Sequence, residues 1–292
     1  MALILSGAPV AAAITKDLIA RREALNRRGI EPCLAILRIG ARGDDLAYER
    51  GAIKRWAKVG IRAVSVVLPE DCTQEALMTE IEKINTDERI HGCLMFRPIP
   101  KHLDEDTACE ALNTCKDVDS MTAASLKTVF TGRGEGYAPC TAQSCIELLK
   151  YYGIDPAGKR AVVIGRSLVI GRPVSMMLQA YNATVTVCHT KTVDLPGVCR
   201  EAEILVVAAG KAGVADASFT NPDQVVIDVG INITPDGGIC GDVCFDEVEP
   251  KVRAISPAPA GVGSVTTAVL CKHVIEAAEK AQPETLTERQ MP

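Results

Sequence analysis

Short apolar runs alternate with helix-like stretches along almost the whole chain, and this alternation constrains the fold more than any other feature. In the amino-terminal half, the apolar runs occupy 33–40, 62–69 and 91–96. Helices are expected between and after them, near 45–59, 73–86 and 104–114. Strands that alternate with helices are typical of parallel sheets with right-handed crossovers. The first half of the chain is therefore predicted to be an α/β domain.

A second series of apolar runs follows at 160–165, 183–189, 203–210 and 224–232. These runs are almost continuously hydrophobic, as in parallel sheets that helices cover on both faces. Because 292 residues exceed the usual size of a single compact core, two domains are expected. We predict a first domain at 1–142 with a returning helix at 268–282, a second at 143–267, and a disordered tail at 283–292.

Composition narrows the class of function. A net charge of −5 argues against nucleic acid or an anionic membrane surface as a partner. No stretch reaches the 18 or so apolar residues of a membrane span. The 12 cysteines are scattered without a C-x-x-C pair, and there are only four histidines, so no metal site is predicted. The cysteines are expected to be reduced, mostly buried thiols of a cytoplasmic protein.

The segment AVVIGRSLVIGRPVSMML (161–178) reads as a strand, a glycine-containing turn and a helix. Gly165 ends the strand, and Gly171 with Pro173 lies where a helix would begin. Free backbone N–H groups and the helix dipole at that point would suit a pyrophosphate. The spacing is G-x5-G and not the G-x-G-x-x-G dinucleotide motif, so a plain strand-to-helix turn is the alternative.

The end of the next strand indicates which dinucleotide would bind. An NAD site usually has an acid at this point to bind the ribose hydroxyls. Here the strand ends in His189-Thr190-Lys191 without an acid, and Arg166 lies in the preceding turn. Two cations and a hydroxyl suit the 2′-phosphate of NADP. The alternative is that Arg166 and Lys191 are merely solvated loop residues.

Five segments together resemble the methylenetetrahydrofolate dehydrogenase/cyclohydrolase family. They are GRSLVIGRP, VIDVGIN (226–232), KDVDS (116–120), APCT (138–141) and PAPAGVGSVT (257–266). The similarity extends over nearly the whole chain. It implies a two-domain α/β protein with an N-terminal catalytic domain, a Rossmann-like NAD(P)-binding domain and a C-terminal helix that returns to the first domain. It also implies a homodimer that binds tetrahydrofolate derivatives in a cleft between its domains.

The resemblance assigns roles to individual residues. Tyr48 matches the ring that stacks on the p-aminobenzoyl part of the folate, and Asp119 matches the carboxylate that binds the pterin. From the residues alone, Asp119 could instead cap the helix that follows it. The other expected folate-side residues are Pro259, Gly261 and Val262. The expected cofactor residues are Thr141, Gly165, Arg166, Ser167, Gly171, Thr190, Lys191 and Ile231.

Three features, at four positions, depart from the family pattern. In a helix, Tyr48, Ala52 and Arg55 share one stripe, and Ala52 stands where the family has its catalytic lysine. Phe96 stands where a glutamine supports that lysine. The glycine-rich loop reads PAGVGS in place of PGGVGP, with Ala260 and Ser264 as the changes.

These departures shape the expected function. We expect an NADP-dependent methylenetetrahydrofolate dehydrogenase in which cyclohydrolase activity is weak or absent. Lys54 should face away from Ala52, the Arg55 guanidinium is a poor acid–base catalyst, and strand alternation should direct Arg97 away from Phe96. The alternatives are a bifunctional enzyme with a rebuilt site, a weakened folate- or NADP-binding protein, and a dehydrogenase for another small substrate. Retention of Tyr48 and Asp119 argues against the last of these.

Overall fold

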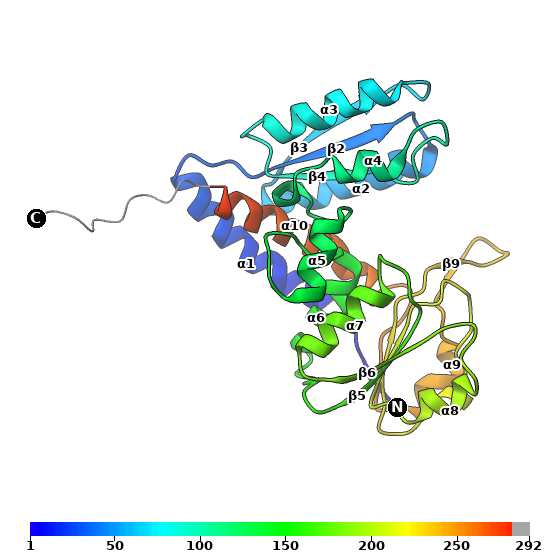
Figure 1. The fold of residues 1–292 in the computed structure, drawn as a ribbon. Coiled ribbons are helices and arrows are strands. Elements are labelled where there is room, and N and C mark those ends of the chain that lie inside the picture. Colours follow the sequence, from blue (N-terminus) through cyan, green and yellow to red (C-terminus); the bar gives the residue numbers. More distant parts are fainter. Residues whose placement is uncertain (282–292) are drawn as a thin grey trace, which may run out of the picture. The chain divides into compact units, whose positions relative to one another are not determined.

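The structure is a computed structural model that describes residues 1–281; the side chains of Asp44, Ala47 and Tyr48 lie outside this description. The tail predicted at 283–292 also lies outside it. Contacts divide the chain into two compact units (Figure 1). One comprises 1–14 and 123–269, and the other comprises 15–122 with the chain from Leu270. Each contains one parallel sheet of several strands, and we call them the six-stranded unit and the three-stranded unit.

The three-stranded unit has the strand order β3-β2-β4, with all neighbours parallel. The strands are β2 (Cys33–Ile39), β3 (Arg62–Leu68) and β4 (Gly92–Met95). The helices are α2 (Gly43–Val59), α3 (Gln74–Thr86) and α4 (Glu105–Glu110), followed by a 3-10 turn at Thr114–Lys116. The helix expected at 104–114 ends early because the Asn85 side chain bonds the carbonyl of Ala111 and the amide of Asn113.

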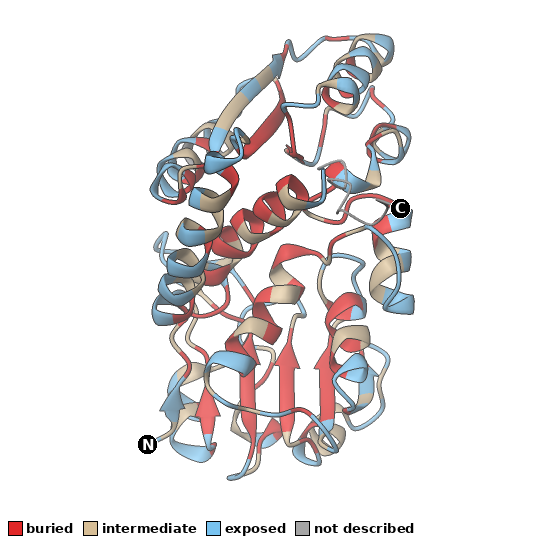
Figure 2. Ribbon diagram, turned by 90° about the vertical axis from the view of Figure 1, so that its left-hand side faces the viewer, coloured by how far each residue is buried: buried red, intermediate tan, exposed pale blue. Residues whose placement is uncertain are grey.

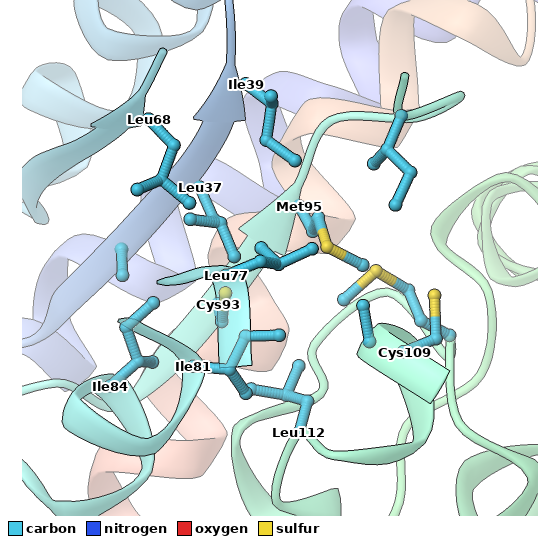
Figure 3. Close-up of a cluster of buried hydrophobic side chains, with 14 of the residues drawn as sticks. Leu37, Ile39, Leu68, Leu77, Ile81, Ile84, Cys93, Met95, Cys109 and Leu112 are labelled. Carbon is cyan, nitrogen blue, oxygen red and sulfur yellow. The ribbon is translucent and has the colours of Figure 1, made fainter. Parts of the chain in front are cut away.

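The core of this unit lies between its sheet and the helices α3 and α4. All seven residues of β2 are buried, as expected for a central strand covered on both faces. Figure 3 shows Leu37 and Cys93 from the sheet near Leu77 and Ile81 from α3. Helix α3 begins at an N-cap, because the Thr73 hydroxyl accepts the Ala76 amide. Its leucine and isoleucines at helical spacing then form the buried face.

The six-stranded unit has the strand order β1-β11-β8-β7-β5-β6, and every neighbouring pair is parallel. Its strands are β1 (Leu3–Ile4), β5 (Arg160–Ile164), β6 (Thr184–Cys188), β7 (Ile204–Val207), β8 (Val225–Asp228) and β11 (Ala254–Ile255). The inner strands β7 and β8 are buried throughout, as Figure 2 shows in red. Because β5 lies between β6 and β7, the strand order reverses there, which is where open α/β sheets bind ligands at their carboxyl edge.

The remaining described elements of this unit connect or flank the sheet. The helices are α5 (Ala123–Thr131), α6 (Cys140–Tyr151), α7 (Gly171–Ala180), α8 (Leu195–Arg200) and α9 (Phe245–Val248), and 3-10 turns occur at Ala217–Phe219 and Glu249–Lys251. A small hairpin is formed by β9 (Asn232–Ile233) and β10 (Ile239–Cys240). The α/β class and the parallel sheets expected from the sequence are thus confirmed.

The contact division falls within two long helices, α1 (Gly7–Arg27) and α10 (Gly263–Lys280). In the three-stranded unit, Arg21 on α1 and Glu279 on α10 form an ion pair at 2.6 Å. The carboxyl-terminal helix therefore returns to this unit, as expected. None of the described helices is long and apolar enough to cross a membrane.

The division by contacts differs from the domain boundaries that we predicted from the sequence. It groups residues 1–14 and 123–142 with the six-stranded sheet. For the amino terminus the cause is strand pairing, because Leu3 and Ile4 pair in parallel with Ala254 and Ile255. The boundaries at 1–142 with 268–282 and at 143–267 stay a prediction.

Candidate active site

In the three-stranded unit, a cavity of about 280 Å³ lies where strand β4 ends. It is lined by Asp45, Leu94, Met95, Phe96, Arg97 and Asp119. Asp45 comes from the first turn of α2, and Asp119 comes from the loop after the 3-10 turn. The cavity therefore combines an apolar wall from the strand with two carboxylates and a guanidinium.

The loop that carries Asp119 is held by its neighbour Asp117, which is fully buried. One Asp117 carboxylate oxygen accepts the Met121 amide at 2.8 Å. The other accepts the amide and the hydroxyl of Thr122, at 2.9 and 2.8 Å. Asp117 also forms an isolated parallel bridge with Cys93 on β4. These bonds fix the loop against the strand, so Asp119 is presented at the cavity by a rigid support.

Arg97 lines the same cavity as Phe96, so our expectation that it points to the other side was wrong. Strand β4 ends at Met95, and alternation of side chains does not apply beyond the end of a strand. The Arg97 Nη1 atom lies 3.9 Å from Glu105 Oε1. The cavity thus contains a cation next to the position where the family has its glutamine.

Helix α2 carries Tyr48, whose side chain is outside the described part of the structure, and Ala52. Ala52 is 4% exposed and belongs to the buried face of the helix, together with Glu49 and Trp56. Arg55, by contrast, is exposed. The shared helical stripe that we predicted for Ala52 and Arg55 therefore does not give them the same environment.

A buried ion pair joins α2 to the sheet next to Tyr48. The Arg38 guanidinium on β2 donates from Nε to Glu49 Oε2 at 3.0 Å, and the Ser65 hydroxyl on β3 donates to the other oxygen of Glu49. Arg38 also donates to the carbonyl of Gly40. Because one carboxylate holds groups from two strands, this network determines the orientation of the first half of α2.

In the six-stranded unit, the turn between β5 and α7 is the tight connection that the glycines predicted. Gly165 has a φ of 127°, and a Cβ there would lie 2.9 Å from the carbonyl carbon of Ala208 on the neighbouring chain segment. A Cβ on Gly171 would lie 2.7 Å from the Arg166 nitrogen. Only glycine fits at either position, because the backbones approach so closely.

The free amides of this turn are not at the start of the helix, where we expected them. Ser167 Oγ accepts the Ile170 amide at 3.1 Å and the Gly171 amide at 3.5 Å, and its carbonyl accepts the Arg172 amide. Ser167 therefore satisfies donors that a helix start leaves open. In the described chain, the amides of this turn that have no hydrogen-bond partner are those of residues 166–169.

Thr190 and Lys191 follow β6, and Arg166 follows β5. Because these two strands are parallel neighbours, the three residues lie after adjacent strand ends. The Gly165 amide donates to the Cys188 carbonyl at 2.9 Å, which joins the two strand ends. Arg166, Thr190 and Lys191 are all exposed. The predicted group of two cations and a hydroxyl therefore lies at one edge of the sheet.

The remaining predicted positions lie in the same unit. Thr141 is in the first turn of α6, and Ile231 follows β8 with 66% of its side chain exposed. Pro259, Gly261 and Val262 lie between β11 and α10. Val262 is only 2% exposed, and Gly261 is buried as well.

Two buried aspartates at this edge were not among the predicted residues. They are Asp228, the last residue of β8, and Asp242, which follows β10. Their signal in the sequence is an acid within two residues of a glycine, in VIDVG and in CGDV. Among the described residues, no group of three or more histidine, cysteine, aspartate or glutamate side chains could hold a metal ion.

Comparison with known proteins identifies the family of the chain. Residues 5–119 match the catalytic domain of tetrahydrofolate dehydrogenase/cyclohydrolase, and residues 139–282 match its NAD(P)-binding domain. A bifunctional protein FolD from Carboxydothermus hydrogenoformans is 50% identical over 281 residues, which cover 96% of this chain and 98% of the relative.

Two solved structures have the same fold. The bifunctional FolD from Campylobacter jejuni has a TM-score of 0.93 and 36% identity, covering 96% of this chain and 99% of that one. FolD from Trypanosoma brucei, complexed with NADP cofactor and inhibitor, has a TM-score of 0.88 and 35% identity over 96% and 98% of the two chains. Together with the two domain matches, these similarities show that the chain belongs to the tetrahydrofolate dehydrogenase/cyclohydrolase family.

Proposed function

We propose that this protein uses NADP to oxidise 5,10-methylenetetrahydrofolate to 5,10-methenyltetrahydrofolate in one-carbon metabolism. The observation that carries the proposal is the carboxyl edge of the six-stranded sheet. There, Arg166 and Lys191 leave neighbouring strands, and no carboxylate immediately follows β6. That charge pattern favours a 2′-phosphate. The NADP bound by the Trypanosoma brucei relative supports the same choice of cofactor.

The oxidation demands geometry and not proton transfer by a side chain. A C–H bond of the bridging methylene breaks, and its electron pair leaves with the hydrogen as hydride. The positive charge that remains is shared by the two adjacent folate nitrogens. NADP, when bound, supplies the hydride acceptor. Because the protein only has to hold the two carbons near contact distance, the step does not require a lysine at position 52.

We assign the expected residues to two ligands. Tyr48 and Asp119 would bind and orient the folate, and Pro259, Gly261 and Val262 are the other residues assigned to it. The residues that would hold the dinucleotide are Thr141, Gly165, Arg166, Ser167, Gly171, Thr190, Lys191 and Ile231. The cavity next to Asp119 and the free amides of 166–169 support these assignments.

An absorbance assay at about 340 nm with methylenetetrahydrofolate and NADP tests the proposal. We expect enzyme-dependent formation of NADPH. Tight folate binding without any NADPH would instead favour the weakened binding protein. Formation of NADPH only with another small substrate would instead favour a dehydrogenase for that substrate.

We further propose that cyclohydrolase activity is weak or absent. Hydrolysis adds water to the methenyl carbon and opens the ring, so a group near that carbon must move protons. Ala52 has no ionisable group and lies on the buried face of α2, and Phe96 cannot orient such a group. Decay of the methenyl absorbance, where spontaneous hydrolysis is slow, should show little or no enzyme-dependent component, and robust enzyme-dependent hydrolysis would refute the proposal. Conversely, the double substitution Ala52→Lys, Phe96→Gln should increase enzyme-dependent hydrolysis.

One observation favours a second candidate, a hydrolytic site rebuilt from other residues. Arg97 and Asp45 line the same cavity as Phe96 and Asp119. A carboxylate can accept a proton from water, and a guanidinium can stabilise the developing negative charge. If methenyl hydrolysis is robust, Asp45→Asn and Arg97→Ala should each abolish it while NADPH formation continues. Asp71→Asn, on an exposed loop of the same unit, is the matched control.

We also propose that the protein is a cytoplasmic homodimer. The support is the family membership of the chain and its twelve free thiols, nine of which are buried. Light scattering after size-exclusion chromatography tests the homodimer, since a single peak at the monomer mass would refute it. Fractionation of cells that express the protein tests its location.

A further inference from the structure

Asp228 and Asp242, the two buried aspartates at the carboxyl edge of the six-stranded sheet, are 2% and 0% exposed. Neither has a role in the reaction described above. A buried carboxylate is costly unless several donors surround it, so its donors indicate what it holds in place.

Asp242 collects four donors from two loops. Its Oδ2 atom accepts the amides of Ala209 at 2.7 Å and Gly210 at 2.8 Å. Its Oδ1 atom accepts the Lys211 amide and the Asn232 side-chain amide, both at 2.9 Å. Three successive backbone amides that converge on one anion form a nest, an arrangement that elsewhere binds phosphate. In this protein the anion in the nest is a side chain.

Asp228 holds Asp242 in place. Its Oδ1 atom accepts the amides of Gly230 at 2.9 Å and Asp242 at 3.0 Å, and its Oδ2 atom accepts the Val243 amide at 3.1 Å. Its own amide donates to Ser256 Oγ at 2.8 Å. This bond connects the two aspartates to Ser256, the first residue after β11.

The surrounding glycines show how closely these groups are packed. A Cβ on Gly230 would overlap the Asp242 carboxylate, and a Cβ on Gly241 would overlap the Asp228 carboxylate. Ile231 lies between Gly230 and Asn232, which both contact these carboxylates. A Cβ on Gly263 would lie 3.4 Å from Ile231 Cδ1. The chain segments that follow β7, β8 and β11 are therefore all held by the same two carboxylates.

We propose that Asp242, supported by Asp228, is a positioning residue for the dinucleotide. It fills the amide nest at 209–211, so that phosphate is left to the free amides of 166–169. It also fixes the loop that presents Ile231. This inference rests on the proposed function, because the ligand that it positions is NADP.

The test compares Asp242→Asn with the unmodified protein, measuring NADP binding by titration calorimetry and initial rates with each substrate. The asparagine keeps the size of the side chain but turns one acceptor into a donor that faces N–H groups. Loss of charged hydrogen bonds of this kind predicts a roughly 10- to 100-fold weaker Kd and higher KM for NADP. The KM for the folate should stay unchanged. A purely structural role would lower the active fraction, and therefore kcat, and leave both KM values unchanged.

A second variant tests the nest directly. Asp242→Ala empties it, and added formate should restore NADP affinity in a saturable way by replacing the carboxylate. Asp155→Asn is the matched control, because Asp155 caps the Ala157 amide away from the predicted cofactor residues. A folded Asp242→Asn protein with unchanged NADP affinity would overturn the inference. If the unmodified protein itself neither binds NADP nor forms NADPH, the proposed function fails instead.

Discussion

The dinucleotide edge of the six-stranded sheet and the cavity beside Asp119 differ in what holds their ligand-facing groups. At the sheet edge the positions depend mainly on backbone: glycines allow close approach, a turn offers its amides, and two buried carboxylates bind further backbone amides. At the cavity they depend on side chains from a strand end, a helix and a loop. Gly165 and Gly171 keep the turn of the first region tight, whereas Phe96 in the second region and Ala52 on helix α2 depart from the family pattern.

This difference has a chemical reason. Hydride transfer needs two carbons at a fixed separation, and a rigid backbone supplies that. Hydrolysis needs a group that moves protons, and one side chain can be lost without disturbing the fold. Ala52 packs on the buried face of α2 beside Trp56, so the substitution leaves the helix in place. If hydrolysis is weak or absent, as we propose, hydride transfer can therefore remain.

The largest effect is expected from a Cβ at the sheet edge. Gly165→Ala should destabilise the protein by at least about 3 kcal/mol, because the residue has a positive φ and no space for a side chain. Urea denaturation measures this change. Gly158→Ala is the control, since its φ is 72° but a Cβ there would meet nothing within 4 Å. Similar losses for both variants would show that close packing at this edge is not what matters.

Asp228 should make stability depend on pH. Burial, together with the nearby Asp242 carboxylate, raises the pKa of Asp228 from 3.8 to about 6, although three backbone amides oppose the shift. Since the folded pKa is the higher one, the folded state loses stability as pH rises from about 4 to 6 and no more above that. The shift corresponds to roughly 3 kcal/mol. The difference in unfolding free energy between the unmodified protein and Asp228→Asn should change by this amount over that window. A constant difference would contradict the assignment.

On the folate side, Asp119→Asn tests whether the cavity is the binding site. We expect kcat/KM for methylenetetrahydrofolate to fall about 100-fold, because a charged acceptor of the pterin N–H groups is lost. NADP affinity should not change. Asp104→Asn, which removes an exposed helix cap in the same unit, is the control for stability. Unaltered folate kinetics in the Asp119 variant would remove Asp119 from the site.

Arg166→Ala examines which dinucleotide the sheet edge prefers. We expect the KM for NADP to rise about 10-fold or more and the KM for NAD to change little, since only NADP has the additional phosphate. Steady-state rates with both cofactors measure this. An equal rise for NADP and NAD would mean that Arg166 does not contact the 2′-phosphate.

The smallest expected effect comes from the altered glycine-rich loop. Ala260 has a φ of 80°, in the left-handed region that an alanine adopts only at a cost. Ala260→Gly should therefore raise the free energy of unfolding by about 1 kcal/mol, as measured by urea denaturation. Ala217→Gly, in a regular 3-10 turn, should lower it and serves as the comparison. A loss of stability in Ala260→Gly would show that the loop has no strain to relieve.

Local patterns in the sequence were sufficient to predict the longer strands, several of the helices and the type of sheet. Continuous apolar runs indicated β5, β7 and β8, and glycines marked the turn at Gly165, because burial on both faces and positive φ each leave a trace in the residue itself. The missing acid after β6 is likewise visible in the sequence. The absence of a lysine at position 52 can also be read there directly.

Other features depended on where the chain brings distant residues together. The strand at Leu3–Ile4 joined a sheet whose partner strand lies some 250 residues away, and Arg97 shared a cavity with Phe96 because β4 stops at Met95. Asp228 and Asp242 met only because the β9–β10 hairpin folds back between them. Periodicity and residue type report the environment of a single element, whereas contacts between elements arise from the packing of the whole chain. The sequence by itself therefore determined which chemical groups the protein has, and the tertiary structure decided which of them act together.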